Sequence, residues 1–285
     1  MKKKYNLNFI NNELIDDEKY LWRYMDFHKF LSFIFKESLY FTRLDKFDDK
    51  REGITLKHLF YQNVKKNLDN HPMFDEVRKY STIDTMGSEM NKIDSELENI
   101  QRFNFANCWN IGEKESESVA MWNLYSNPES LAIRINYKNL KDKITINGID
   151  SNFFEDNIIC GPVKYFDFQK NPDGIDLDNP QLNSVFTKDK SFNYENEYRI
   201  IIQEKIREIP EINYKDNIRK SHIEKQHNSF FNYPGIELKL KDFQNYQFEI
   251  ILHPKSQKWI KGNIKKVMKK FNIKFQIFES NLTIE

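Results

Sequence analysis

Few cysteines and no long apolar run set the first limits on what this chain can be. Only two cysteines, Cys108 and Cys160, occur among 285 residues, and neither lies in CxxC or Cys/His ligand spacing. This speaks against a disulfide framework and against structural zinc. The longest apolar runs are a handful of residues, such as Phe33-Ile34-Phe35, far short of the roughly 20 residues that span a bilayer. We therefore expect a cytoplasmic protein with no membrane partner.

Net charge and recognised catalytic motifs are also lacking. Lys plus Arg total 44 and Asp plus Glu total 43, a net charge of +1, so no global field steers the chain toward nucleic acid. The basic start, residues 1–4, is followed by polar residues such as Asn11 and Glu13, which predicts no signal peptide. No Walker loop, GxGxxG, HExxH or GxSxG motif occurs. The acidic turn at Asp45, Asp48, Asp49 and Glu52 lacks the glycine and the ligand order of an EF-hand loop, so no metal site is expected.

The hydrophobic patterns predict one elaborated α+β domain over residues 1–285. Its centre is expected to be a mixed, mostly antiparallel sheet with flanking helices, and residues 54–102 are expected to form a helical insertion beside the sheet. The expected strands are 21–25, 39–42, 105–109, 131–137, 158–168, 195–202, 236–240, 248–252 and 273–278, and the expected helices include 27–35, 88–103, 119–125 and 255–274.

A charged strand is the most informative part of the sequence. Because side chains alternate along a strand, Glu195, Glu197 and Arg199 are predicted to share one face. The apolar residues that follow, 200–202, indicate a strand covered on both sides. Buried charges must be paired, bind a ligand or lie at the mouth of a cleft. The pattern therefore predicts either a functional site or a purely structural Glu197–Arg199 pair.

Aromatic residues accompany two further candidate positions. Arg23 lies between Trp22 and Tyr24, where a guanidinium can grip phosphate or stack on a ring. Trp122 and Tyr125 are three residues apart on a predicted helix and share a face. They are candidate walls of a slot for a flat ring, and the alternative is that they are ordinary core residues.

A lysine-rich helix near the end of the sequence offers a different kind of site. Residues 255–274 contain eight lysines and no acidic residue, while the apolar positions form one stripe. Such a face can follow a phosphate backbone, or it can be an ordinary solvated surface. The lysines that would carry nucleic-acid binding are Lys265, Lys266, Lys269 and Lys270.

Four blocks of sequence together resemble the bacterial family called domain of unknown function 2971. They are LWRYM at Leu21 to Met25, LYFTRLDKFDDKREG at Leu39 to Gly53, CWNIGEKESESVAMWNLYS at Cys108 to Ser126, and KSFNYENEYRI at Lys190 to Ile200. Many members carry Asn-Asp-Pro where this chain has Asp-Asp-Lys at 48–50. The resemblance implies a role in phage defence or abortive infection.

The order of the blocks is also similar to that of ADP-ribosyltransferase-like folds, which implies NAD as the cofactor. By that likeness Arg23 or Tyr24 would hold NAD, Thr42 would follow, and Glu197 would supply the catalytic carboxylate, with Glu195 assisting acceptor chemistry. Arg199 would keep Glu197 ionised, and Trp122 and Tyr125 would stack on the leaving ring. No Ser-Thr-Ser strand motif is present.

The expected function is therefore a toxin-like defence or stress effector that consumes NAD as a transferase or glycohydrolase, with a protein or nucleic acid as acceptor. Two alternatives stay open. One is a nucleic-acid-binding or nuclease-like defence module that uses the lysine-rich helix. The other is a non-enzymatic sensor or scaffold in which the charged strand is structural. The sequence does not decide the oligomeric state.

Overall fold

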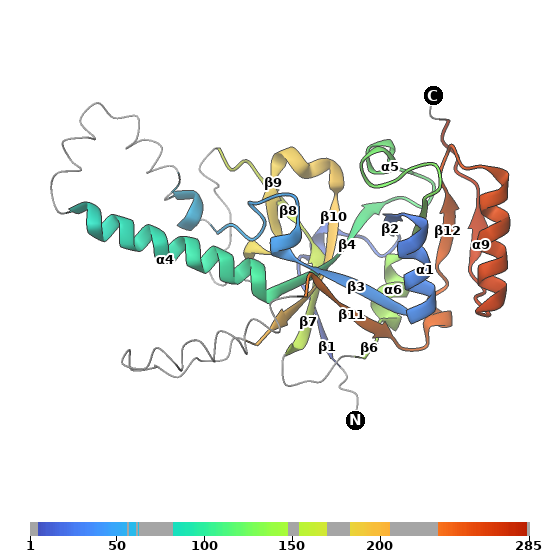
Figure 1. Cartoon of the computed structure of the whole chain (residues 1–285), viewed down its shortest axis with the longest axis horizontal. Helices are drawn as coiled ribbons and strands as arrows, with labels where there is room; N and C mark the ends of the chain where they lie inside the picture. The colour runs from blue at the N-terminus through green and yellow to red at the C-terminus, as the bar shows by residue number, and fades with distance from the viewer. Residues whose placement is uncertain are drawn as a thin grey trace.

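A mixed, mostly antiparallel sheet forms the centre of the computed structural model (Figure 1). The structure describes residues 5–55, 57–60, 62, 82–147, 154–169, 183–205 and 233–283. Within these ranges, one sheet has 11 strands and a second has two. Only the pairs β1–β7 and β12–β13 of the large sheet are parallel. The predicted α+β class and the mixed, mostly antiparallel sheet are confirmed.

The large sheet follows the order β1-β7-β10-β4-β2-β5-β12-β13, and β3, β11 and β6 branch from β4. Its strands are β1 (Asn6–Phe9), β2 (Tyr20–Met25), β3 (Ser38–Arg43), β4 (Asn104–Gly112), β5 (Leu131–Asn136), β6 (Ile146–Asn147), β7 (Phe154–Pro162), β10 (Glu197–Glu204), β11 (Gly235–Leu240), β12 (Glu249–Leu252) and β13 (Gln276–Phe278). The small sheet pairs β8 (Lys164–Phe166) with β9 (Thr187–Asp189).

Helices lie beside the sheet and extend from it (Figure 1). The α-helices are α1 (Phe27–Lys36), α4 (Thr82–Phe103), α5 (Val119–Tyr125), α6 (Tyr137–Lys143) and α9 (Lys258–Lys270), and the 3-10 helices are η1 (Asn12–Leu14), η2 (Leu44–Lys46), η3 (Lys190–Glu195) and η4 (Phe243–Tyr246). The helix expected at 88–103 begins earlier, at Thr82, and α4 projects away from the sheet. Residues 63–81 of the expected insertion lie outside the described residues.

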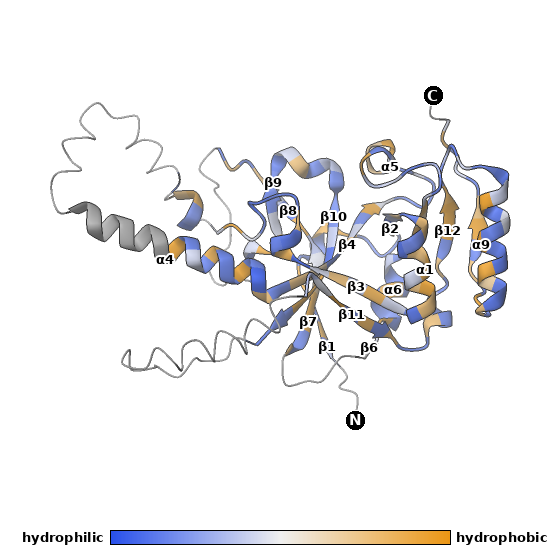
Figure 2. Ribbon diagram, in the orientation of Figure 1, coloured by the Kyte–Doolittle hydropathy of each residue, from blue (hydrophilic) through white to orange (hydrophobic). Residues whose placement is uncertain are grey.

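The core covers both faces of β10, as the apolar run predicts. Ile200 and Ile202 belong to the main hydrophobic cluster, whereas Ile201, on the opposite face, belongs to a second cluster. All three are fully buried. Figure 2 shows apolar residues along the central strands and polar residues on the outer faces of α4 and α9. The sheet thus provides a rigid support for charged side chains on the same strand.

Two predicted strand boundaries are wrong. Glu195 ends the 3-10 helix η3, and β10 begins only at Glu197. Asn196 between them adopts a left-handed conformation with φ 38°, which asparagine tolerates better than most residues, and its side-chain amide donates to the Ile111 carbonyl at 2.7 Å. The expected strand 158–168 is divided as well, because β7 ends at Pro162 and β8 joins the other sheet.

No helix within the described ranges is both long and apolar enough to cross a membrane. Both cysteines are free thiols, with Cys160 buried and Cys108 partly exposed. The described residues contain no group of three or more His, Cys, Asp or Glu side chains arranged to hold a metal ion.

Candidate functional site

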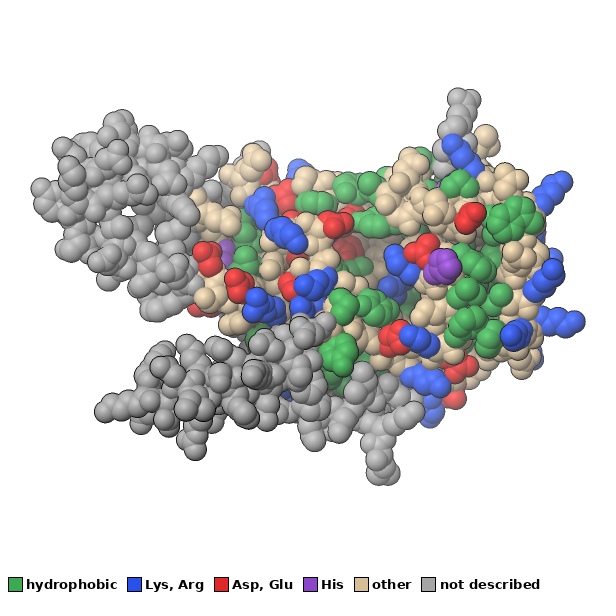
Figure 3. Space-filling model, in the orientation of Figure 1, with side chains coloured by type: hydrophobic (Ala, Val, Ile, Leu, Met, Phe, Trp, Pro, Cys, Tyr) green, Lys and Arg blue, Asp and Glu red, His purple; other side chains and the backbone are tan. Residues whose placement is uncertain are grey.

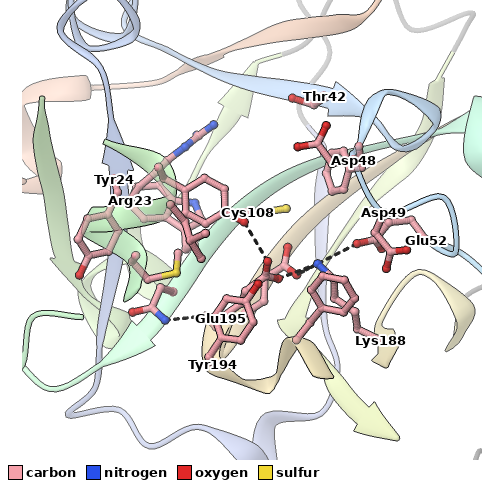
Figure 4. A pocket seen from close by; sticks show the side chains of 18 of the residues that line it. Arg23, Tyr24, Thr42, Asp48, Asp49, Glu52, Cys108, Lys188, Tyr194 and Glu195 are labelled. Carbon is pink, nitrogen blue, oxygen red and sulfur yellow. Dashed lines mark hydrogen bonds and ion pairs between the residues drawn. The ribbon is translucent and has the colours of Figure 1, made fainter. Parts of the chain in front are cut away.

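A cavity of about 520 Å³ lies where β2, β4, α5 and the end of η3 meet the turn after β3. This volume is within the range of small-molecule sites. Figure 4 shows labelled side chains from these separate segments directed into the same space. The lining includes six predicted residues: Arg23, Tyr24, Thr42, Tyr125, Glu195 and Glu197.

Glu197 and Arg199 form a bidentate ion pair on β10. Arg199 Nε donates to Glu197 Oε1 at 3.0 Å, and Arg199 Nη2 donates to Glu197 Oε2 at 2.8 Å. The two residues share a face because they are two positions apart on the strand. Arg199 is fully buried behind the cavity, where Nη1 also donates to the Val185 carbonyl at 2.8 Å. Arg199 therefore orients Glu197 and does not itself line the cavity.

Two residues that sequence reasoning missed, Glu52 and Lys188, complete the network. Lys188 Nζ lies 2.6 Å from Glu195 Oε2 and 3.0 Å from Glu52 Oε1. Arg199 Nη2 lies 2.9 Å from Glu52 Oε2. The sequence places Glu52 only in an acidic turn and does not reveal its burial, whereas in the fold its side chain is 1% exposed. No spacing in the sequence links Lys188, on β9, to the charged strand.

Glu195 reaches the cavity even though it is not on the strand. The Tyr125 hydroxyl donates to Glu195 Oε1 at 2.9 Å, and the Asn110 side-chain amide donates to the Glu195 carbonyl at 2.5 Å. The helix α5 that carries Tyr125 begins at Val119 and is capped by Ser118, whose hydroxyl oxygen accepts from the Met121 amide at 3.3 Å. Both Glu195 and Glu197 consequently face the cavity.

The carboxyl groups of Glu52 and Glu197 have opposite pKa shifts. Burial alone would raise the pKa of Glu197, but the positive charges of Arg199 and Lys188 outweigh it and lower that pKa. Burial raises the pKa of Glu52 despite the attraction of Arg199 and Lys188, and the charge of Glu197 adds to the rise. Burial would lower the pKa of Lys188, but Glu197 and Glu52 raise it. Glu197 and Lys188 are therefore charged at neutral pH.

Arg23 is a cationic residue of the cavity lining and differs from Lys46 and Lys188, which pair with carboxylates. Its Nη2 donates to the Tyr40 carbonyl at 3.3 Å, and its guanidinium lies 5.8 Å from the centroid of the Trp109 ring. Among the described residues, no carboxylate is paired with Arg23. Burial lowers the pKa of Arg23 to about 10, so the group stays cationic at neutral pH and is free to bind an anion.

Trp122 does not line the cavity, and its expected place in an aromatic slot is wrong. Its ring is fully buried and packs edge-on against the ring of Tyr24, with the ring centroids 4.8 Å apart. Its indole nitrogen donates to Glu117 Oε2 at 2.9 Å. Trp122 thus anchors α5 from behind, while Tyr125 on the same helix is half exposed at the cavity.

The lysine face of α9 is separate from this cavity. Lys265, Lys266, Lys269 and Lys270 are all exposed, while Ile260, Ile264 and Met268 bury the other side of the helix. Figure 3 shows basic side chains projecting from the edge of the molecule where α9 lies. None of the four lysines lines the cavity.

Comparison with known proteins finds a match to a family model over part of the chain. Residues 121–200 match the family model DUF2971, described as a protein of unknown function. The matched segment includes Tyr125, Lys188, Glu195, Glu197 and Arg199, so it carries much of the charged network. The resemblance is confirmed over this segment. Neither the curated proteins nor the solved structures contain a match to the chain.

Proposed function

We propose that this protein is an NAD-consuming enzyme, an ADP-ribosyltransferase-like transferase or a glycohydrolase, that acts in the cytoplasm as a bacterial defence or stress effector. The observation that carries the proposal is the arrangement of the cavity. A fixed, ionised carboxylate, Glu197, and a guanidinium without a carboxylate partner among the described residues, Arg23, line one cavity together with aromatic side chains. A ligand that joins a phosphate group to a sugar and a flat ring matches this arrangement.

Glu197 is the proposed catalytic carboxylate. Breaking the bond between nicotinamide and ribose develops positive charge on the sugar, and a fixed carboxylate in a cavity shielded from water stabilises that charge. Arg199 holds both carboxylate oxygens of Glu197 and lowers its pKa. Glu197 is thus oriented and ionised before the ligand binds, so little reorganisation is needed during the reaction.

The remaining residues are assigned to binding and to the acceptor. Arg23 is proposed to hold the pyrophosphate, because guanidinium forms forked hydrogen bonds to phosphate oxygens. Tyr24 and Thr42 line the same cavity, and Tyr125 offers a ring face to the nicotinamide. Glu195, held by Tyr125 and Lys188, is proposed to orient the acceptor, which is water, a protein or a nucleic acid.

Calorimetric titration with NAD tests the binding part of this proposal. We expect Arg23→Ala to weaken NAD binding by about tenfold or more, the usual scale for one charge-assisted hydrogen bond of roughly 1.5–3 kcal/mol. Arg102→Ala is the matched control, because Arg102 lies in the last turn of α4, does not line the cavity and has its side chain 49% exposed. Equal NAD affinities of the wild type and Arg23→Ala would show that Arg23 does not bind NAD.

A second candidate function rests on the exposed lysine face of α9. We propose nucleic-acid binding as the alternative activity, carried by Lys265, Lys266, Lys269 and Lys270. Replacing all four with Gln should weaken binding to a DNA or RNA duplex and flatten its salt dependence, because each neutralised phosphate releases counterions. Unchanged affinity and unchanged salt dependence would eliminate this alternative.

A further inference from the structure

The buried network beside the cavity has one more negative charge than positive charges. Glu52, Glu195 and Glu197 face Lys188 and Arg199, and each of these five side chains is less than a tenth exposed. Three carboxylates against two cations leave one negative charge uncompensated. A buried charge without a partner is strongly unfavourable, so a proton or a bound cation must balance this one.

No other cation of the described residues pairs with these three carboxylates. Arg51, next to Glu52 in sequence, instead faces Asp189 at 3.9 Å and the ring of Phe168. Cys108, Tyr125 and Tyr165, which also lie near the network, are neutral, since burial raises their pKa values. Lys46, Asp48 and Asp49 line the same cavity, but Lys46 pairs with Asp45, and none of the three forms an ion pair with a member of the network. The imbalance therefore belongs to the network itself.

Hydrogen bonding indicates which carboxylate carries the proton. Both oxygens of Glu197 accept hydrogen bonds from Arg199. The two oxygens of Glu195 accept from Tyr125 and Lys188. Glu52 Oε1 accepts from Arg199 and lies 3.0 Å from Lys188 Nζ, but Oε2 is buried and accepts no hydrogen bond, although it lies 2.9 Å from Arg199 Nη2. Among the three carboxyl groups, only that of Glu52 thus has an oxygen that accepts no hydrogen bond, which favours Glu52 as the group that carries the proton.

We infer that the cavity takes a ligand with one positive charge beside Glu195 and Glu197, and that this cation replaces a proton held by Glu52 in the free protein. The O–H bond of the Glu52 carboxyl breaks, the proton leaves to the buffer, and no covalent bond forms. The inference rests on the proposed function in one respect, because the oxidised nicotinamide ring of NAD is such a cation.

A shared contact couples the carboxyl groups of Glu52 and Glu197. Glu197 Oε2 and Glu52 Oε2 lie 2.8 and 2.9 Å from the same atom, Arg199 Nη2. A positive charge placed at Glu197 therefore acts on Glu52 at short range through a water-poor interior, where electrostatic interactions are strong. The raised pKa of Glu52 and the lowered pKa of Glu197 agree with a protonated Glu52 and an ionised Glu197 in the free protein.

The walls of the cavity also suit a cationic group. Phe47, Trp109, Tyr125 and Tyr194 line it together with the carboxylates. Aromatic faces attract cations, and this attraction is strongest where water is excluded. A flat cationic ring would gain from both the aromatic walls and the carboxylates, whereas a neutral ring of the same shape would gain only from the walls.

A pair of rings that differ in charge tests the inference separately from catalysis. The probes are 1-methylnicotinamide, a cation, and nicotinamide, which is neutral, each titrated by calorimetry at pH 7 in buffers with different ionisation enthalpies. We expect the cation to bind about tenfold or more tightly and to release up to about one proton per ligand. Glu52→Gln should retain the preference and abolish the proton release, whereas Glu98→Gln, an exposed control on α4, should behave like the wild type.

Carbon-13 spectra of glutamate-labelled wild type provide a readout that needs no variant. We expect one glutamate carboxyl to be neutral at pH 7 in the free protein and to ionise when 1-methylnicotinamide is added. A cation that binds no more tightly than nicotinamide, or not at all, would overturn the inference, as would spectra in which every glutamate is ionised. Failure of NAD cleavage alone would contradict the proposed function and leave these two results intact.

Discussion

Arg199 Nη2 contacts Glu197 Oε2 at 2.8 Å and Glu52 Oε2 at 2.9 Å, which joins the central strand β10 to a turn 147 positions earlier in the chain. One guanidinium thus contacts both the catalytic candidate and the carboxyl group that we infer to hold the proton of the network. The candidate site depends on this contact as much as on the residues that line the cavity.

Replacing Arg199 with Met should destabilise the protein strongly. The substitution leaves Glu52 and Glu197 buried without their main cation, and breaking a buried ion pair in this way costs about 3–5 kcal/mol. The free energy of unfolding, measured in urea, gives the loss. Arg102→Met, at an exposed ion pair on α4, should change it by less than about 1 kcal/mol. A similar small change for both variants would show that the network is not buried as described.

Glu52→Gln should change how stability depends on pH. Because the pKa of Glu52 is raised in the folded state, the folded protein binds more protons than the unfolded chain above the ordinary glutamate pKa of about 4.3. The wild type should therefore lose stability, relative to Glu52→Gln, as the pH rises from that value through the folded pKa. Urea midpoints at several pH values between 4 and 8 measure the difference. Parallel curves for the two proteins would contradict the raised pKa.

Glu197 should make stability depend on pH in the opposite direction from Glu52. Its pKa is lowered in the folded state, so its ionised form contributes stability above the ordinary glutamate pKa, and that contribution is lost as the pH falls through the folded value. Glu197→Gln should thus be destabilising at pH 7 and approach the wild type in acid. A stability difference that stays constant between pH 3 and 7 would exclude this role of the charge.

Glu117→Gln should loosen α5 and the cavity wall that it carries. The Glu117 carboxylate accepts from the Trp122 indole at 2.9 Å, the Ser280 hydroxyl at 2.7 Å and the Asn281 amide at 2.8 Å. Weakening these charge-assisted bonds should cost about 1–2 kcal/mol and speed hydrogen exchange over residues 113–126. Glu129→Gln, at an exposed position beyond α5, is the matched control. Equal exchange in both variants would show that the end of the chain does not hold α5.

Part of the site could be predicted from the sequence because buried charges on an apolar strand demand partners. That reasoning correctly grouped Glu197 with Arg199 and expected the strand to be covered on both faces. It misplaced Glu195, because one left-handed residue, Asn196, interrupts the extended backbone, and the alternation of side chains does not reveal such a break. Glu195 reaches the cavity from a 3-10 helix instead of the strand.

The rest of the network is set by tertiary contacts that have no period in the sequence. Glu52 reaches Arg199, and Lys188 reaches Glu52 and Glu195, only because the turn after β3 and the strand β9 come together beside β10. Helical spacing alone also does not separate Trp122 from Tyr125. They are three positions apart on one helix, yet Trp122 packs in the core and Tyr125 lines the cavity. The fold class was easier to predict, because it depends on many apolar positions together.

The most direct test of the proposed function is the release of nicotinamide from NAD, followed by mass spectrometry with the wild type and Glu197→Gln at equal folded concentration. We expect the wild type to release nicotinamide and Glu197→Gln to lose at least about 100-fold in rate, the scale for removing one group that stabilises transition-state charge, while still binding NAD. Full release by Glu197→Gln, or no release by wild type that binds NAD, would contradict the assignment of Glu197 as the catalytic carboxylate.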